Sequence, residues 1–147
     1  DWNGGDRVTN DELVLVDCDV LAPCALEQVV TGDNADGVRA KTIVEGANGP
    51  ITPAGDEILE ANGALVLPDV LANAGGVVVS YFEWVQGLQE YFWKEPEVNS
   101  KLRDIVTRAF NETWHLYEDR EISMRSAAYG VAVGRVSEAT VTRGLYP

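Results

Sequence analysis

The chain has 147 residues, of which 46% are hydrophobic, and its formal net charge is −13. This length and composition allow a buried core and argue against intrinsic disorder. Nucleic-acid binding is unexpected, since it needs a basic surface. A membrane partner is also unexpected, because no apolar run reaches the roughly 18 residues that a spanning helix requires.

The acidic residues are scattered along the chain, and three lysines stand beside eight arginines. A surface with many acids and few lysines is typical of proteins from a salt-rich cytoplasm, where screening relieves the repulsion between like charges. We therefore expect a cytoplasmic protein and hypothesise that it is halophilic.

The cysteines and the single histidine do not predict a metal site. Cys18 and Cys24 lie six residues apart, without a second cysteine pair or a nearby histidine, which makes a poor zinc site. We expect free, mostly buried thiols in a reducing cytoplasm. His115 falls in a long helical segment, and we expect it to be a surface or core residue.

Short apolar segments alternate with helix signals through the first half of the chain. A short helix is expected after Thr9, a helical turn opens at Asp33, and Thr52 with Pro53 begins a longer helix. Strands are expected at residues 20–22, 42–44 and 65–67. Apolar strands that alternate with helices predict a parallel sheet covered on both faces.

Polar or glycine-containing stretches follow all three strands, at residues 23–25, 46–48 and 69–76. Open α/β sheets bind ligands at the carboxyl ends of their strands, so these stretches predict one shared rim; each could also be a simple turn. No G-x-G-x-x-G loop is present. We therefore expect the second half of a Rossmann-like dinucleotide-binding domain (1–92), followed by long C-terminal helices on the domain interface (93–147).

The stretch 68–84 is the strongest candidate site. A helix is expected directly after the third strand, with two consecutive glycines near its start, each costing about 1 kcal/mol relative to alanine. Asn73, Val77 and Ser80 are spaced at i, i+4 and i+7, and so they would share one helix face. This pattern indicates a small-molecule site, while tight helix packing through the glycines stays open as the alternative.

The helix that carries Ser80 is expected to continue to about Phe92. The aromatic residues at helical spacing within it are interpreted as core, namely Tyr81, Phe82 and Trp84.

Two further helices complete the predicted chain. Pro96 begins a long helix that reaches about Arg120, with a wide apolar stripe for packing. Ser123 caps the final helix, in which Gly130 and Gly134 would allow close contact with another helix.

The stretch Asn73-Ala-Gly-Gly-Val-Val-Val-Ser-Tyr-Phe-Glu-Trp84 closely resembles the signature of hexameric glutamate dehydrogenases. The resemblance runs from about Thr9 to Gly144. Further matching motifs are Pro23-Cys24-Ala25, Asp33-Asn34-Ala35, Glu45-Gly46-Ala47-Asn48-Gly49-Pro50 and Ala127-Ala128-Tyr129.

The resemblance implies an enzyme that converts L-glutamate, water and NAD or NADP to 2-oxoglutarate, ammonium and the reduced cofactor. Hydride transfer would pass through an imino acid, and the enzyme would be a homohexamer. The catalytic lysine and aspartate of this family lie in an N-terminal domain that this chain lacks. By the resemblance, this is a C-terminal fragment that is inactive alone and holds no catalytic residue; a non-catalytic nucleotide-binding module is the alternative if the chain is complete.

The resemblance also implies which residues of this chain would bind the substrate. Ser80 would hydrogen-bond the distal carboxylate of glutamate, and Val77 would line the side-chain pocket. Branched-chain and aromatic amino-acid dehydrogenases share the fold but have a more apolar pocket at the Ser80 position. The serine therefore favours glutamate, with those other amino acids as the alternative substrates.

The cofactor residues implied by the resemblance lie at the three strand ends. Asn73 and Asn48 would contact the nicotinamide side, the latter within the turn that contains Gly46 and Ala47. The adenosine half would be bordered through backbone atoms of Pro23, Cys24 and Ala25. Cys24 replaces the more usual alanine, which a backbone contact should tolerate.

Overall fold

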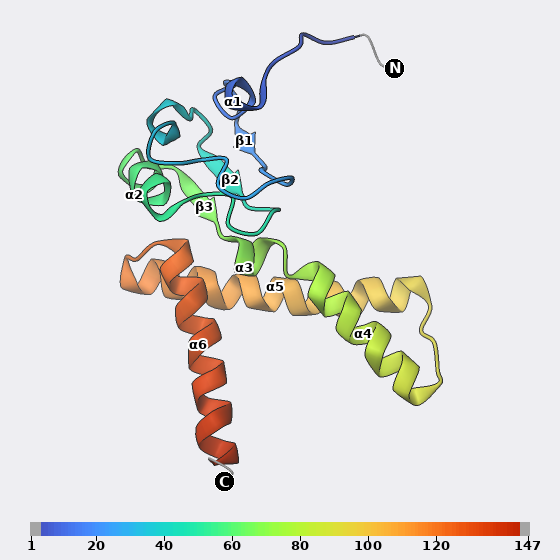
Figure 1. Cartoon of the computed structure of the whole chain (residues 1–147). Helices are drawn as coiled ribbons and strands as arrows, with labels where there is room; N and C mark the ends of the chain where they lie inside the picture. Colours follow the sequence, from blue (N-terminus) through green and yellow to red (C-terminus); the bar gives the residue numbers. More distant parts are fainter. Residues whose placement is uncertain (1–3, 145–147) are drawn as a thin grey trace. The chain divides into compact units, whose positions relative to one another are not determined.

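The computed structural model describes residues 4–144, and the chain packs into two compact units, one ending at Val66 and the other beginning at Leu67. The division predicted at residues 92 and 93 concerns function and stays a prediction. The elements are α1 (Asn10–Leu13), β1 (Val20–Leu21), η1 (Ala35–Gly37), β2 (Thr42–Val44), α2 (Pro53–Ala61), β3 (Leu65–Leu67), α3 (Asp69–Ala72), α4 (Gly75–Gln89), α5 (Glu95–Arg120) and α6 (Met124–Arg143) (Figure 1).

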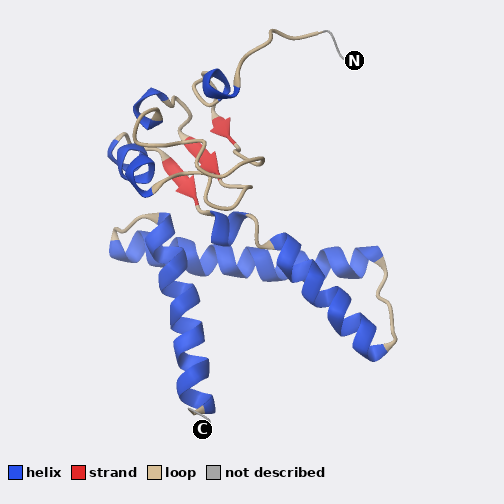
Figure 2. Cartoon of the chain, viewed as in Figure 1, coloured by secondary structure: helices blue, strands red, loops and turns tan. Residues whose placement is uncertain are grey.

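A three-stranded sheet in the order β1-β2-β3 organises the first unit, and its strands run in the same direction (Figure 2). β1 pairs in parallel with β2, in the register Val20 with Thr42. The core beneath it includes the fully buried side chains of Val30, Ile43 and Leu59. The predicted parallel sheet is confirmed, with β1 one residue shorter than expected.

Local capping explains where the helices of this unit begin. The Thr52 hydroxyl accepts a hydrogen bond from the Gly55 amide at 3.2 Å, with Pro53 at the first helical position. At α1, Thr9 and Glu12 form a capping box. Hydrogen bonds from the Thr9 backbone and hydroxyl lower the pKa of the exposed Glu12 carboxyl. The turn expected at Asp33 is the short helix η1, which begins two residues later.

The second unit is helical, and α5 packs against both α4 and α6. Phe82 on α4 is buried and meets Trp93 edge to face, with ring centroids 5.5 Å apart. Gln86 accepts a hydrogen bond from the Trp93 backbone amide at 2.6 Å and holds the α4–α5 connection. α4 ends at Gln89 rather than near Phe92, because Glu90 adopts a left-handed conformation (φ 52°) that stops the helix.

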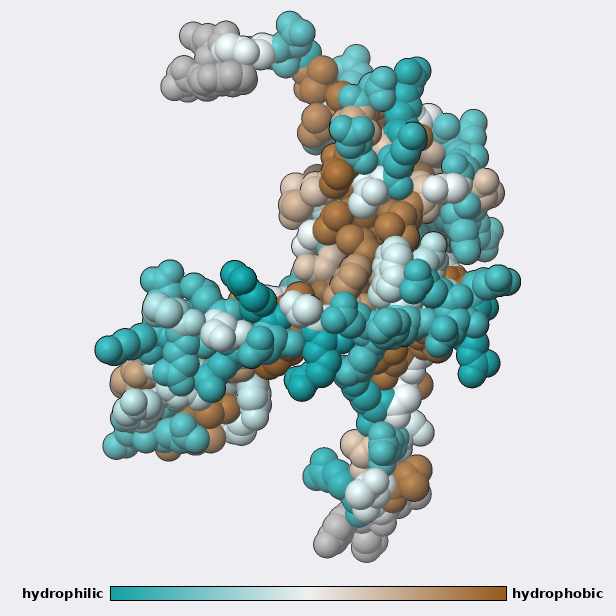
Figure 3. All heavy atoms as spheres, turned by 180° about the vertical axis from the view of Figure 1, so that it is seen from behind, coloured by the Kyte–Doolittle hydropathy of each residue, from teal (hydrophilic) through white to brown (hydrophobic). Residues whose placement is uncertain are grey.

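The aromatic residues of α4 are not all core residues. Phe82 is buried, whereas Tyr81 is 58% exposed and Trp84 61% exposed, so the prediction was wrong for these two. Phe82 is covered by Trp93 of the α4–α5 connection, whereas Tyr81 and Trp84 contact each other at an exposed part of α4, with ring centroids 5.8 Å apart. Seen from behind in Figure 3, the side chains along α5 are mostly hydrophilic, whereas apolar side chains gather over the first unit.

The predicted close contact in the last helix is half confirmed. A Cβ atom built on Gly130 would lie 3.1 Å from a methyl carbon of Leu116 on α5, so the two helices do approach there. At Gly134 a Cβ atom would meet no described atom within 4 Å. Ser123 caps α6 as predicted, since its hydroxyl accepts from the Ser126 amide at 3.2 Å.

Candidate functional site

The structure brings together the ends of the first two strands. The backbone amides of Gly46 and Ala47 both donate to the carbonyl of Pro23, at 3.0 and 2.9 Å. The loops beyond these turns are also paired, because the Gln28 amide donates to the carbonyl of Gly49 at 2.9 Å. The two predicted stretches therefore form one fixed edge of the first unit.

Cys24 and Gly46 approach very closely within this edge. A Cβ atom built on Gly46 would lie 2.6 Å from the Sγ atom of Cys24 and 3.3 Å from its Cβ. Gly46 is thus required by this close approach and not by an unusual backbone angle. Both cysteines are free, as expected, but Cys24 is exposed and Cys18 only half-buried. The expected burial was wrong for Cys24, which lies in the loop after β1, whereas Cys18 packs partly buried against the core.

A groove of about 670 Å³ lies beside this edge in the first unit. It is lined by α1, by the end of β1 and by the loop that follows, including Pro23, Cys24 and Ala25. Its volume falls within the range of small-molecule sites. The neighbouring turn presents Gly46 and Asn48 as exposed residues.

Glu45 is a feature of this edge that sequence reasoning missed. It directly follows β2 and is fully buried. Its carboxylate is not left unsatisfied, since no buried side-chain oxygen or nitrogen among residues 4–144 lacks a hydrogen-bond partner. Strand alternation could have revealed it, because Ile43 and Glu45 are two residues apart and therefore face the same side.

The third predicted strand end belongs to the second unit, where the expected single helix is interrupted. Asn73 lies in a two-residue turn between α3 and α4, and so it does not share a helix face with Val77 and Ser80. Its backbone amide still closes the turn of α3 by donating to the Asp69 carbonyl at 3.0 Å. The helix breaks here because Asn73 leaves helical geometry (φ −100°, ψ 3°), and helical structure resumes at Gly75 and Gly76, the first residues of α4.

Val77 and Ser80 are brought together on α4. They are three residues apart, so they are neighbours on the helix surface, and Val77 is 71% exposed with Ser80 also exposed. A Cβ atom on Gly76 would meet no described atom within 4 Å, and one on Gly75 would lie 3.9 Å from a Leu102 methyl carbon. Within the described chain, close helix packing therefore does not explain both glycines.

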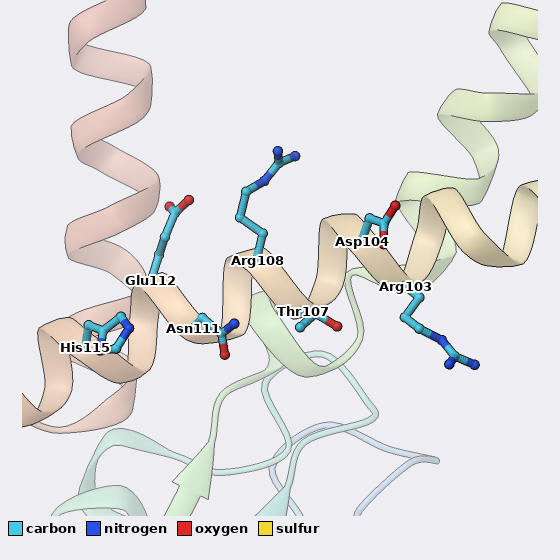
Figure 4. A pocket seen from close by; sticks show the side chains of 7 residues that line it. All are labelled: Arg103, Asp104, Thr107, Arg108, Asn111, Glu112 and His115. Carbon is cyan, nitrogen blue, oxygen red and sulfur yellow. The ribbon is translucent and has the colours of Figure 1, made fainter.

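A second hollow, of about 440 Å³, lies along α5 from Arg103 to His115. Figure 4 shows that its side chains point in different directions around the helix, with Arg103 and Arg108 on opposite sides. Residues 4–144 contain no group of three histidine, cysteine or acidic side chains placed to hold a metal ion. No described helix is long and apolar enough to cross a membrane.

A parallel sheet with glycine-containing turns at its strand ends, followed by long helices, defines the second half of a Rossmann-like dinucleotide-binding domain. The family model of Glutamate/Leucine/Phenylalanine/Valine dehydrogenase matches residues 2–144. The chain belongs to this family.

Similar proteins of known sequence and structure agree with this family assignment. The chain is 52% identical to the glutamate dehydrogenase of Thermotoga maritima over 97% of this chain and 34% of that protein. The hetero-hexameric glutamate dehydrogenase of Thermus thermophilus, solved with leucine bound, superposes with a TM-score of 0.91 at 35% identity, over 98% of this chain and 35% of the other. The enzyme of Peptoniphilus asaccharolyticus gives 0.78 at 40% identity, over 85% and 32%. The chain thus spans about a third of their length.

Proposed function

We propose that this chain is the C-terminal part of an NAD(P)-dependent glutamate dehydrogenase, which interconverts L-glutamate with 2-oxoglutarate and ammonium. The observation that carries the proposal is the 52% identity, over nearly the whole chain, to a protein with that activity in its name. The hetero-hexameric relative supports assembly into a hexamer, and we propose a homohexamer. Since the chain spans about a third of that relative, the remainder of the polypeptide would supply the catalytic lysine and aspartate, and this part alone would be inactive.

The substrate contacts that we propose begin with Ser80 and Val77. The Ser80 hydroxyl donates a hydrogen bond to the distal carboxylate of glutamate, a charge-assisted bond of the stronger class. Val77 forms an apolar wall against the methylene groups of the substrate. Their adjacent, exposed positions on α4 support this assignment.

The proposed cofactor is NAD or NADP, and the residues present fit it. The paired strand ends and the adjoining groove offer backbone groups and volume for the adenosine half along Pro23, Cys24 and Ala25. Asn48, held by the turn at Gly46 and Ala47, contributes an amide. The cofactor, when bound, accepts the hydride from the substrate. Asn73 contributes a second amide on the nicotinamide side.

Substrate preference tests the proposal against its alternative within the family. We expect the full-length polypeptide to oxidise glutamate with a kcat/KM at least tenfold above that for leucine, valine or phenylalanine, since a site built to bond a second carboxylate rejects substrates without it. The measurement is NAD(P)H formation with each amino acid in turn. A preference for an apolar amino acid would instead identify a branched-chain or aromatic amino-acid dehydrogenase.

The acidic surface leads to a prediction on salt. We propose a halophilic protein of the cytoplasm, and we expect its unfolding temperature to rise with KCl as screening weakens the repulsion within a chain of net charge −13. Thermal unfolding at increasing KCl measures this, with sucrose of equal osmolality as the control for solute exclusion. Full stability in the absence of salt would refute the halophilic assignment.

A further inference from the structure

The short helix α3 depends on contacts with other elements of the chain for its stability. It is a single turn, and Pro68 at its start has no side chain that could cap it. Helices this short are not stable in water by themselves. α3 packs on α5 and α6, with Leu71 buried. The position of α3 therefore depends on the elements around it.

The first turn of α6 supplies one such contact. Arg125 places its Nη1 atom 3.9 Å from the Oδ1 atom of Asp69, the first residue of α3. The two side chains are 22% and 21% exposed, so water screens this pair less than an ion pair at the open surface. On either side of Arg125, buried residues fix the turn, namely Met124, Ala127 and Ala128.

Asp69 is in turn connected directly to Asn73. The Asn73 backbone amide donates to the Asp69 carbonyl at 3.0 Å, so the two residues are the ends of one hydrogen-bonded turn. The Asp69 carboxylate also accepts from the Val70 amide at 2.7 Å. A displacement of Asp69 would therefore move the asparagine as well.

We propose that Arg125 is a positioning residue, whose ion pair with Asp69 holds Asn73 where its amide meets the nicotinamide side of the cofactor. The inference rests on the proposed function. A reaction that depends on the placement of the cofactor loses rate when a supporting group shifts by as little as an ångström. In this proposal Arg125 acts on the rate through Asp69 and Asn73.

The test compares Arg125→Met, Asp69→Asn and their combination in the full-length polypeptide. We expect kcat to fall roughly tenfold in each single variant, with an unchanged KM for glutamate, since positioning is lost and substrate binding is not. The double variant should be no slower than either single one, because both remove the same link. Arg125→Lys should recover part of kcat, since it keeps the positive charge that faces Asp69.

The matched control is Arg135→Met. Arg135 lies on the same helix, pairs with Glu112 of α5 and is exposed, so its loss should leave kcat unchanged. The inference would be overturned if kcat were unchanged in Arg125→Met, or if the losses in the double variant were additive. The proposed function is tested separately, by the activity of the parent protein with glutamate.

Hydrogen exchange at the backbone amide of Asn73 is a second measurement, which does not depend on catalysis. Exchange at this amide should be several-fold faster in Arg125→Met than in the parent protein, and unchanged in Arg135→Met. The same exchange rate in Arg125→Met and in the parent would overturn the inference, even if the parent is inactive.

Discussion

Replacing Gly46 by alanine is expected to destabilise the protein by about 1–3 kcal/mol, the usual cost of overpacking, and to raise the KM for NAD(P). The new Cβ atom would lie 2.6 Å from the Sγ atom of Cys24, a separation at which either the Cys24 side chain or one of the two strand ends has to move. Because both amides of this turn bind the Pro23 carbonyl, either movement falls within the edge that we assign to the cofactor. Urea unfolding and cofactor titration measure the two effects.

A second variant identifies the cause of this loss. Adding Cys24→Ala to Gly46→Ala removes the sulfur atom in the closest contact, so most of the lost stability should return, although the Cβ atom at 3.3 Å still limits the recovery. Gly76→Ala is the matched control for stability. It places a methyl group in open space within a helix and should stabilise by about 0.5–1 kcal/mol. No rescue by Cys24→Ala would contradict the proposed clash.

The substitution Ser80→Val should raise the KM for glutamate by roughly tenfold to a hundredfold, because a carboxylate left without its hydrogen bond costs about 1–3 kcal/mol. Discrimination against leucine and valine should fall at the same time, since the new side chain is apolar and close in size. Helix stability should change little, because Ser80 is exposed on α4. Steady-state kinetics with glutamate and with the apolar amino acids measure both effects.

The control for this substitution is Ser100→Val, at an exposed position on α5. It makes the same chemical change on another helix and should leave glutamate kinetics as they are. If Ser80→Val also left them unchanged, Ser80 would have no part in the substrate site.

Much of the fold could be predicted because its local signals agree with one another. The Thr52 cap with Pro53 located the start of α2, and the short apolar runs located all three strands. The stretches after β1 and β2 were predicted to share a rim, and the structure pairs them through the Pro23 carbonyl. These features depend on neighbours in sequence or on strand ends that every parallel sheet brings to the same side.

The predictions that were wrong depended on contacts between distant segments or on small balances of propensity. Helical spacing placed Asn73 on α4, but Asn73 leaves helical geometry and ends α3, and α4 begins only at Gly75. Periodicity likewise gave no sign that Trp93 would pack on Phe82 while Trp84 stays exposed. The Arg125 contact joins residues far apart in sequence, and no local pattern predicts such a pair.

The most direct test of the central proposal is the mass of the native polypeptide measured together with glutamate-dependent reduction of NAD(P). The proposal predicts a subunit about three times the 16.0 kDa of this chain, since the chain covers 34% of its Thermotoga maritima relative, and it predicts activity with glutamate. A native polypeptide of 16.0 kDa that binds NAD(P) but does not oxidise glutamate would contradict it and would identify a nucleotide-binding module.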